Sequence, residues 1–109
     1  MSAANIHTTE EFEKIVNENP RFLLIKNSLT CPISKAAFNE YEAFTRDNQD
    51  VQTYYLHVQE SRELSNYIAE KFGVKHETPQ ALLFDQKSVV WNASHWKITK
   101  DSLKSAIQS

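Results

Sequence analysis

Two spacings of apolar residues alternate along this chain. Apolar side chains recur every three or four residues, the spacing of one helix face, over residues 8–18, 32–45, 61–72 and 99–107. Short apolar or β-branched runs, typical of strands, lie at residues 21–27, 51–58, 81–84 and 88–91. A polar turn at 85–87 joins the last two runs into a predicted hairpin, although it lacks an Asn-Gly pair. The pattern predicts the order α-β-α-β-α-β-β-α in one domain over residues 1–109.

Capping residues stand where these predicted helices begin and end. Thr8, followed by Glu11, predicts a capping box at the start of the first helix. Ser61 and Thr99 precede the third and fourth helical patterns, and serine and threonine are favoured N-caps. Gly73 follows the third pattern, at the position where glycine commonly ends a helix. The predicted boundaries therefore rest on residue chemistry as well as on periodicity.

Composition excludes several classes of function. A chain of 109 residues can bury a core without a metal or a disulfide. The formal net charge is −2 and no predicted helix carries a basic stripe, so we expect no nucleic-acid partner. Gly73 is the only glycine, whereas phosphate-binding loops and dinucleotide fingerprints need several. The four histidines and the single cysteine show no metal-ligand spacing, so no metal is expected.

The setting predicted from the sequence is the reducing cytoplasm. One cysteine cannot form an internal disulfide, which argues against a secreted disulfide scaffold. The first residues lack the basic and apolar regions of a signal peptide. No apolar run approaches the length that spans a membrane, so we expect no membrane partner.

The strongest candidate for chemistry is that cysteine, Cys31. It lies between the apolar run at 22–25, which is typical of a buried parallel strand, and the helical pattern that follows. Pro32 comes directly after it, and proline is favoured at the first position of a helix. The sulfur is therefore expected at the positive end of a helix dipole.

The dipole alone lowers a thiol pKa only modestly, so an activated thiolate at Cys31 needs further donors. The available donors are the backbone N–H groups of Ile33 and Ser34 and the hydroxyls of Thr30 and Ser34. Lys35 adds a positive charge nearby in the sequence. The alternative interpretation is an inert cysteine, because a free cysteine often behaves as a small buried apolar residue.

A second stretch, residues 74–80, leads into the strand predicted at 81–84. Proline cannot donate to a sheet ladder, so Pro79 is expected at the start of that strand. From the residues alone, an ordinary trans peptide bond is the default there. His76 lies three residues earlier and is a weaker candidate for a place near Cys31, while the other histidines are expected to be solvated or packed.

Four segments together resemble one family. They are residues 30–34, 54–60, 73–80 and 94–99, with sequences TCPIS, YYLHVQE, GVKHETPQ and SHWKIT. With the order of elements, they resemble the thioredoxin fold and, more narrowly, the monothiol bacilliredoxin family of bacillithiol-using bacteria. The resemblance extends over nearly the whole chain. It implies an α/β thioredoxin-like fold, in which a βαβαββα core with an extra N-terminal helix forms a central mixed sheet flanked by helices.

The resemblance also implies roles for particular residues. Cys31 would attack proteins capped by bacillithiol and accept the cap, with Thr30, Pro32, Ile33 and Ser34 completing the motif around the thiolate. Pro79 would match the cis-proline of the family, and Thr78 would offer its backbone to an extended substrate. Ser34 stands where dithiol relatives carry a resolving cysteine.

The implied activity is that of a monothiol thiol–disulfide oxidoreductase. Its partners would be S-bacillithiolated client proteins, with bacillithiol as the small-thiol co-substrate. Without a second cysteine, recycling has to come from free bacillithiol or from another redoxin. Lysines that could meet the carboxylates of bacillithiol, although a solvated surface is the simpler interpretation, are Lys26, Lys35, Lys75 and Lys97.

Other functions remain compatible with the sequence. Monothiol glutaredoxins share a cysteine followed three residues later by serine, and some carry an iron–sulfur cluster, but Pro32 replaces the glycine of their motif. A non-catalytic thioredoxin-fold interaction domain with an inert Cys31 is the second alternative. A protease-like use of Cys31 with a histidine is the weakest, because no third orienting residue is evident.

Overall fold

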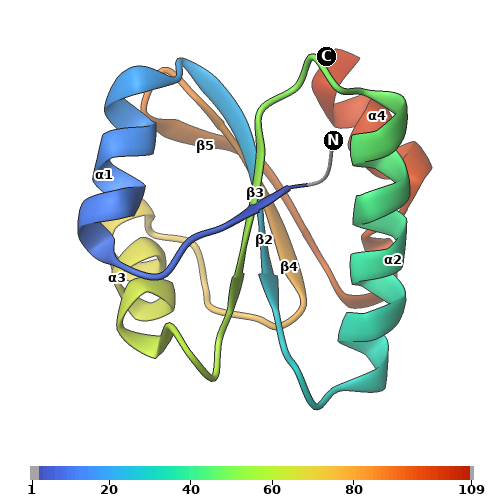
Figure 1. Cartoon of the computed structure of the whole chain (residues 1–109), viewed down its shortest axis with the longest axis horizontal. Coiled ribbons are helices and arrows are strands. Elements are labelled where there is room, and N and C mark those ends of the chain that lie inside the picture. Colours follow the sequence, from blue (N-terminus) through green and yellow to red (C-terminus); the bar gives the residue numbers. More distant parts are fainter. Residues whose placement is uncertain (1–2, 109) are drawn as a thin grey trace.

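The protein forms a five-stranded sheet with helices packed on both of its faces (Figure 1). The computed structural model describes residues 3–108. The elements, in chain order, are β1 (Ala4–Asn5), α1 (Thr9–Glu18), β2 (Arg21–Asn27), α2 (Pro32–Asp47), β3 (Thr53–His57), α3 (Arg62–Phe72), β4 (Gln80–Asp85), β5 (Ser88–Ser94), the short 3₁₀ helix η1 (His95–Lys97) and α4 (Lys100–Gln108).

The strands follow the order β1-β3-β2-β4-β5, with β2 at the centre. β3 pairs parallel with both β1 and β2, whereas β4 pairs antiparallel with β2 and with β5. The mixed sheet and the flanking helices confirm the predicted fold class. β1 was not predicted, because two residues give no periodic pattern. It exists through its pairing with Tyr54 and Tyr55 of β3.

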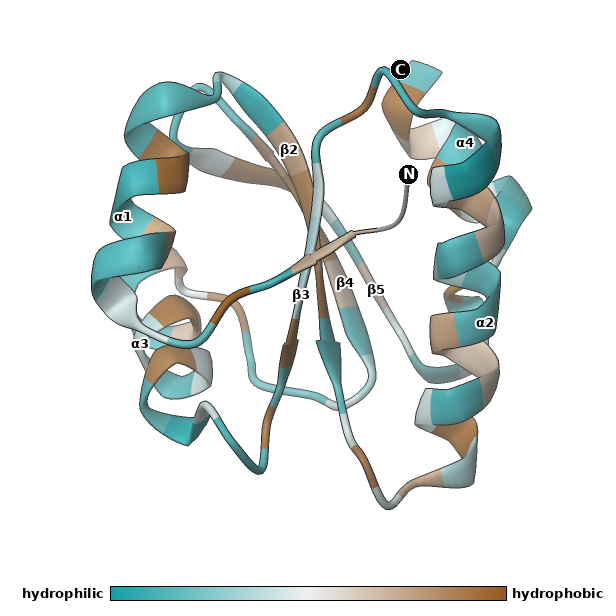
Figure 2. Cartoon of the chain, in the orientation of Figure 1, coloured by the Kyte–Doolittle hydropathy of each residue, from teal (hydrophilic) through white to brown (hydrophobic). Residues whose placement is uncertain are grey.

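Side chains of the central strand β2 build both halves of the core. Phe22 and Leu24 pack in the cluster that includes residues of α1 and α3, while Leu23 and Ile25 pack in the cluster that includes residues of α2 and α4. All four are buried, because helices cover both faces of the sheet. Figure 2 shows the same division, with apolar residues on the central strands and on the inward faces of the helices. This burial fixes the end of β2, from which the cysteine loop departs.

The predicted caps are mostly confirmed. The Thr8 hydroxyl accepts from the Glu11 backbone N–H, and the Glu11 carboxylate accepts from the Thr8 N–H, which completes the capping box. Gly73 adopts a left-handed conformation with φ 64°, as the end of α3 requires. The Thr99 hydroxyl accepts a hydrogen bond from the backbone N–H of Ser102 in the first turn of α4. Ser61 precedes α3 as predicted, but its side chain makes no capping hydrogen bond.

Several boundaries differ from the prediction by a few residues. The β4–β5 hairpin forms without an Asn-Gly pair because Gln86 and Lys87 both adopt positive φ, 52° and 66°. β5 continues to Ser94, since its last residues pair with β4 although they are not typical strand residues. α2 extends two residues beyond the predicted end, to Asp47, and β3 begins two residues later than predicted, at Thr53. The long pairing of β5 with β4 places η1 beside the loop that precedes β4.

Candidate functional site

The only cysteine lies where the central strand gives way to a helix. Cys31 is the residue before α2, with extended backbone angles of φ −104° and ψ 122°, and its side chain is partly exposed. Pro32 occupies the first turn of α2, as predicted, where its missing N–H leaves no hydrogen bond unmade. Because the buried strand β2 ends just before this loop, the Cys31 thiol lies at the N-terminus of a long helix.

Groups of the first turn of α2 favour the thiolate form of Cys31. The Ser34 backbone N–H contributes most, and the Ile33 N–H and the Ser34 hydroxyl add to it. These donors outweigh partial desolvation and lower the pKa of Cys31 below its ordinary value. The Ser34 side chain is fully buried, and apart from Cys31 its hydroxyl has no hydrogen-bond partner among residues 3–108. It is therefore free to donate to a thiolate.

Replacing Ser34 by alanine is expected to raise the pKa of Cys31. The change removes the hydroxyl donor but keeps both backbone N–H donors, so the thiolate loses one of its three hydrogen bonds. The pH profile of Cys31 alkylation measures this, and its midpoint is expected to move upward. An unchanged midpoint would contradict the donation from the hydroxyl. Thr30→Ala is the control, because the Thr30 hydroxyl is not among the groups that lower this pKa.

The loop before Cys31 is held by a residue that sequence reasoning missed. Gln59 donates from its side chain to the Ser28 hydroxyl at 2.8 Å and accepts from the Leu29 backbone N–H at 3.1 Å. The Thr30 hydroxyl lies 3.4 Å from both the Ser28 hydroxyl and the Gln59 amide nitrogen. Thr30 thus belongs to the loop that carries the thiol. Residue 59 falls within the segment 54–60 that carries the family resemblance, which was the only signal for it.

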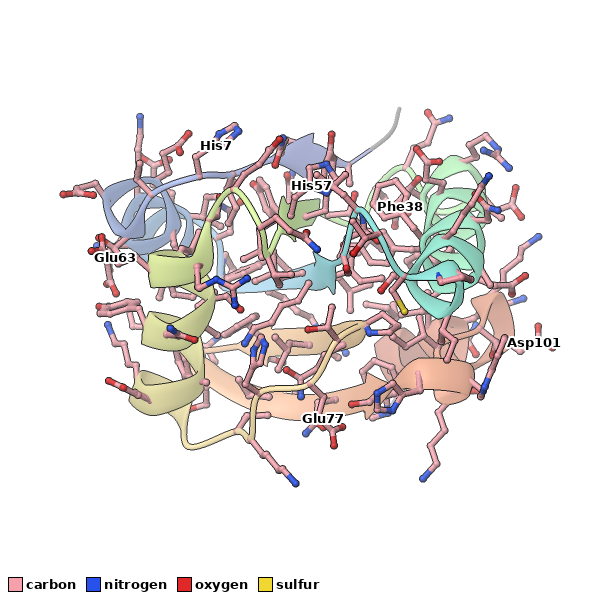
Figure 3. All side chains as sticks on the ribbon, turned by 90° about the horizontal axis from the view of Figure 1, so that it is seen from below. His7, Phe38, His57, Glu63, Glu77 and Asp101 are labelled. Atoms are coloured by element: carbon pink, nitrogen blue, oxygen red, sulfur yellow. The ribbon has the colours of Figure 1, made fainter. Side chains whose placement is uncertain are left out.

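The loop that leads into β4 reaches the same end of the sheet as Cys31. The Thr78–Pro79 peptide bond is cis, as the family resemblance implies. The Pro79 carbonyl accepts from the His95 backbone N–H at 3.0 Å, which ties this loop to η1. Figure 3 looks onto this end of the molecule, with His57 and Phe38 on one side of β2 and Glu77 on the other. The end of β2 therefore has α2 and β3 residues on one side and the loop before β4 on the other.

Lys26 is not a surface lysine, contrary to the prediction. It is 1% exposed and points from β2 toward α3, where its ammonium group donates to the Ser65 carbonyl at 3.0 Å. Burial lowers the pKa of Lys26 to about 8. The alternation of side chains along β2 explains the error, since position 26 follows Phe22 and Leu24 onto the α3 face.

His76 joins this buried lysine to the loop before β4. Its Nδ1 lies 3.3 Å from the Lys26 ammonium, and its Nε2 lies 3.3 Å from the Thr78 hydroxyl. Partial burial, followed by the charges of Lys26 and Arg62, lowers the pKa of His76. His76 is not among the groups that lower the Cys31 pKa, so the structure links it to Thr78 instead of to the thiol.

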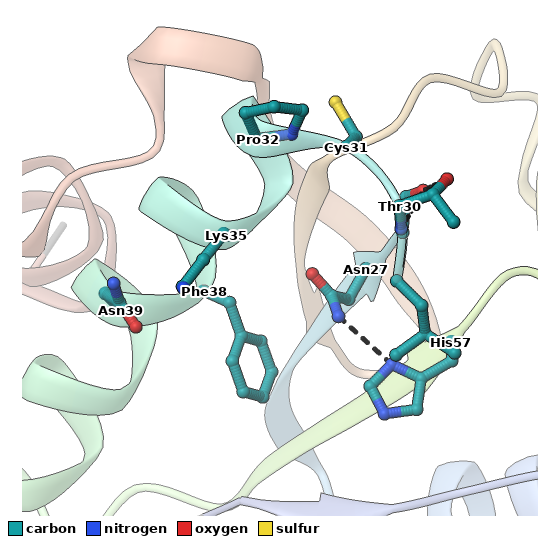
Figure 4. Close-up of a pocket in the computed structure, with 10 residues that line it drawn as sticks. Asn27, Thr30, Cys31, Pro32, Lys35, Phe38, Asn39 and His57 are labelled. Carbon is teal, nitrogen blue, oxygen red and sulfur yellow. Dashed lines mark hydrogen bonds between the residues drawn. The ribbon is translucent and has the colours of Figure 1, made fainter.

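A pocket of about 560 Å³ opens beside Cys31, on the α2 side of β2 and β3 (Figure 4). Inside it, the Asn27 amide nitrogen donates to His57 Nδ1 at 3.0 Å. The residues that line it come from the end of β2, the cysteine loop, α2 and the end of β3, and they are Asn27, Ser28, Leu29, Thr30, Cys31, Pro32, Lys35, Phe38, Asn39 and His57. Sequence reasoning did not predict this pocket. Nine of its ten lining residues lie between positions 27 and 39, but His57 joins them only through the pairing of β3 with β2.

The described part of the chain offers neither a metal site nor a membrane span. Over residues 3–108, no three or more His, Cys, Asp or Glu side chains come together in a group that could hold a metal ion. In the same range, no helix is both long enough and apolar enough to cross a membrane.

Comparison with known proteins agrees with this geometry. A family model described as monothiol bacilliredoxin BrxC matches residues 4–103. A solved structure described as a proposed oxidoreductase with a thioredoxin fold is 40% identical, with a TM-score of 0.91 over 97% of this chain and 94% of that one.

More distant structures share the fold alone. Thioredoxin NaTrxh from Nicotiana alata is 21% identical, with a TM-score of 0.78 over 98% of this chain and 90% of that one. Oxidised mitochondrial thioredoxin 3 from Saccharomyces cerevisiae is 16% identical, with a TM-score of 0.77 over 97% of this chain and 93% of that one.

Proposed function

This chain belongs to the monothiol bacilliredoxin family, and on that premise we propose that it removes bacillithiol from S-bacillithiolated client proteins by attack of Cys31. The family and the thioredoxin fold together assign it a thiol redox role. Beyond that general role, we propose that Cys31 is the nucleophile, that the substrate is a capped client protein, and that the cap is transferred to Cys31.

One observation carries the proposal. Cys31 is partly exposed at the start of α2, and three donors of the first helical turn lower its pKa. The attacking species in disulfide exchange is the thiolate, so a lowered pKa increases the reactive fraction near neutral pH. No second cysteine exists in the 109 residues, which limits the protein to a one-thiol cycle.

The proposed reaction cycle consists of two successive thiol–disulfide exchanges. The Cys31 thiolate attacks the bacillithiol sulfur of the client's mixed disulfide, a bond forms between Cys31 and bacillithiol, and the client thiolate leaves. A second thiolate, from free bacillithiol or from another redoxin, then attacks the bacillithiol sulfur on Cys31. The products are the Cys31 thiolate and a new disulfide that carries the oxidising equivalent away.

The loop beside the thiol supplies the client contacts in this proposal. Thr78 presents backbone groups to an extended client segment, and Pro79 follows it across a cis peptide bond. Thr30, Pro32 and Ile33 complete the motif, since Pro32 begins α2 and the Ile33 N–H donates toward the sulfur. His76 supports Thr78 from the side of α3 through its contact with the Thr78 hydroxyl.

The test uses a model client that carries one bacillithiol cap and a stoichiometric amount of the reduced protein. We expect the client to lose the mass of the cap and Cys31 to gain it, in equal amounts and before any other thiol is added. Addition of free bacillithiol is then expected to restore the Cys31 thiol. A client that keeps its cap, or loses it while Cys31 stays unmodified, would contradict the proposal. The same client mixed with protein alkylated at Cys31 is the control.

A further inference from the structure

Asn27, which lines the pocket beside Cys31, carries a buried acceptor that has no hydrogen-bond partner among residues 3–108. Asn27 is 6% exposed, and its amide nitrogen is engaged by His57 at 3.0 Å. Its amide oxygen is buried and accepts no hydrogen bond from any residue in the range 3–108. In Figure 4 this oxygen points away from His57, toward the side on which α2 begins. A buried acceptor left unpaired costs free energy, so the site favours a ligand that brings a hydroxyl or amide donor.

The charge of the pocket indicates which further groups a ligand should carry. Lys35 supplies a positive charge at its wall, and none of the ten lining residues is acidic. Asn39 adds an amide beside Lys35, while Phe38 and Leu29 provide apolar surface. This combination fits a small molecule that carries hydroxyl groups and a carboxylate, and it disfavours a cationic one.

We propose that this pocket holds the body of bacillithiol while its sulfur is joined to Cys31. The inference rests on the proposed function and adds the place where the small thiol is bound. Bacillithiol joins a cysteine to an amino sugar and malate, so it offers hydroxyl donors for the Asn27 oxygen and carboxylates for Lys35. A volume of about 560 Å³ lies within the range of small-molecule sites, roughly 300–1,000 Å³. Cys31 itself lines the pocket, so one disulfide can span thiol and site.

The position of the pocket separates the small thiol from the client. His57 at the end of β3 forms one wall, whereas Thr78 and Pro79 precede β4. Since β2 lies between β3 and β4 in the sheet, the two regions flank the cysteine loop from opposite sides. The client polypeptide therefore leaves along the Thr78–Pro79 side while the cap remains in the pocket.

The first test compares small disulfides at equilibrium. The protein is titrated with bacillithiol disulfide and, separately, with bis(2-hydroxyethyl) disulfide, which lacks the sugar and the carboxylates, and the Cys31 mixed disulfide is quantified by mass. Lys35→Gln is expected to reduce the preference for bacillithiol about 2- to 5-fold. Using the ratio of the two disulfides cancels any effect of Lys35 on thiol reactivity.

The matched control is Lys97→Gln, at an exposed lysine in η1, on the side of Pro79. This variant is expected to leave the preference unchanged. A loss of preference in Lys97→Gln, together with an unaffected Lys35→Gln, would overturn the pocket assignment and place the small thiol on the client side. Absence of any mixed disulfide with bacillithiol in the wild-type protein would instead overturn the proposed function, and the inference with it.

The second test locates the cap directly. Amide chemical shifts are compared between protein capped at Cys31 by bacillithiol and protein capped by the hydroxyethyl thiol, so that differences report only the body of the ligand. The largest differences are expected at Asn27, Phe38 and His57. Largest differences at residues 75–78 would contradict the inference even if Cys31 accepts the cap.

Discussion

The Cys31→Ser variant is expected to lose cap removal by about a thousandfold or more, down to the rate seen without protein. The serine hydroxyl titrates far above neutral pH, so the variant presents essentially no anionic nucleophile to the mixed disulfide. The donors of the first turn of α2, which favour the Cys31 thiolate, cannot overcome so large a difference. The measurement is the rate at which a capped client loses the mass of bacillithiol.

The fold of this variant is expected to remain intact, because Cys31 is partly exposed and belongs to neither core cluster. Circular dichroism and the thermal midpoint provide this control. A correctly folded Cys31→Ser protein that still removed the cap would end the proposed function, since no other cysteine exists in the chain to take over the attack.

Ser34→Cys is expected to change the products of the reaction. The Ser34 hydroxyl donates toward Cys31 in the thiolate form, so a sulfur at position 34 would face the capped cysteine. Its thiolate would attack the Cys31 sulfur, form an internal disulfide and release bacillithiol, which takes up a proton. Because an intramolecular attack has a high effective concentration, the capped form is expected to fall at least about tenfold in abundance.

Mass spectrometry after one turnover distinguishes the two outcomes. The wild-type protein is expected to carry the cap, whereas Ser34→Cys is expected to have lost two hydrogens and to carry no cap. Ser34→Ala serves as the matched control, because it removes the hydroxyl without adding a nucleophile and is expected to retain the cap. Equal accumulation of the cap in wild type and Ser34→Cys would contradict the orientation of residue 34 toward the sulfur.

The sequence predicts most of the fold because its apolar spacing is regular. The β2 strand is a continuous apolar run, and the helices show one apolar face each, so both kinds of element could be recognised locally. Periodicity fails where an element is short or is completed by pairing. Thus β1, with two residues, and the end of β5 at Ser94 depend on neighbouring strands and not on their own composition.

Lys26 shows a different limit. Its charge suggested a surface position, yet the alternation of side chains along β2 turns it inward. There the Ser65 carbonyl and His76 Nδ1 accept hydrogen bonds from its ammonium group. Local pattern could have indicated the direction, because Phe22 and Leu24 share the same face. It could not indicate the partners, since those come from α3 and from the loop before β4.

By itself, the sequence determined the order of the main elements, the single thiol and the start of a helix directly after it, because each depends on residues adjacent in the chain. The tertiary structure decided what surrounds that thiol. Asn27 and His57 meet only because β2 and β3 pair, and α2 closes the pocket over them. Such contacts join residues far apart in sequence, so they arise from the packing of the sheet and helices and leave no local pattern.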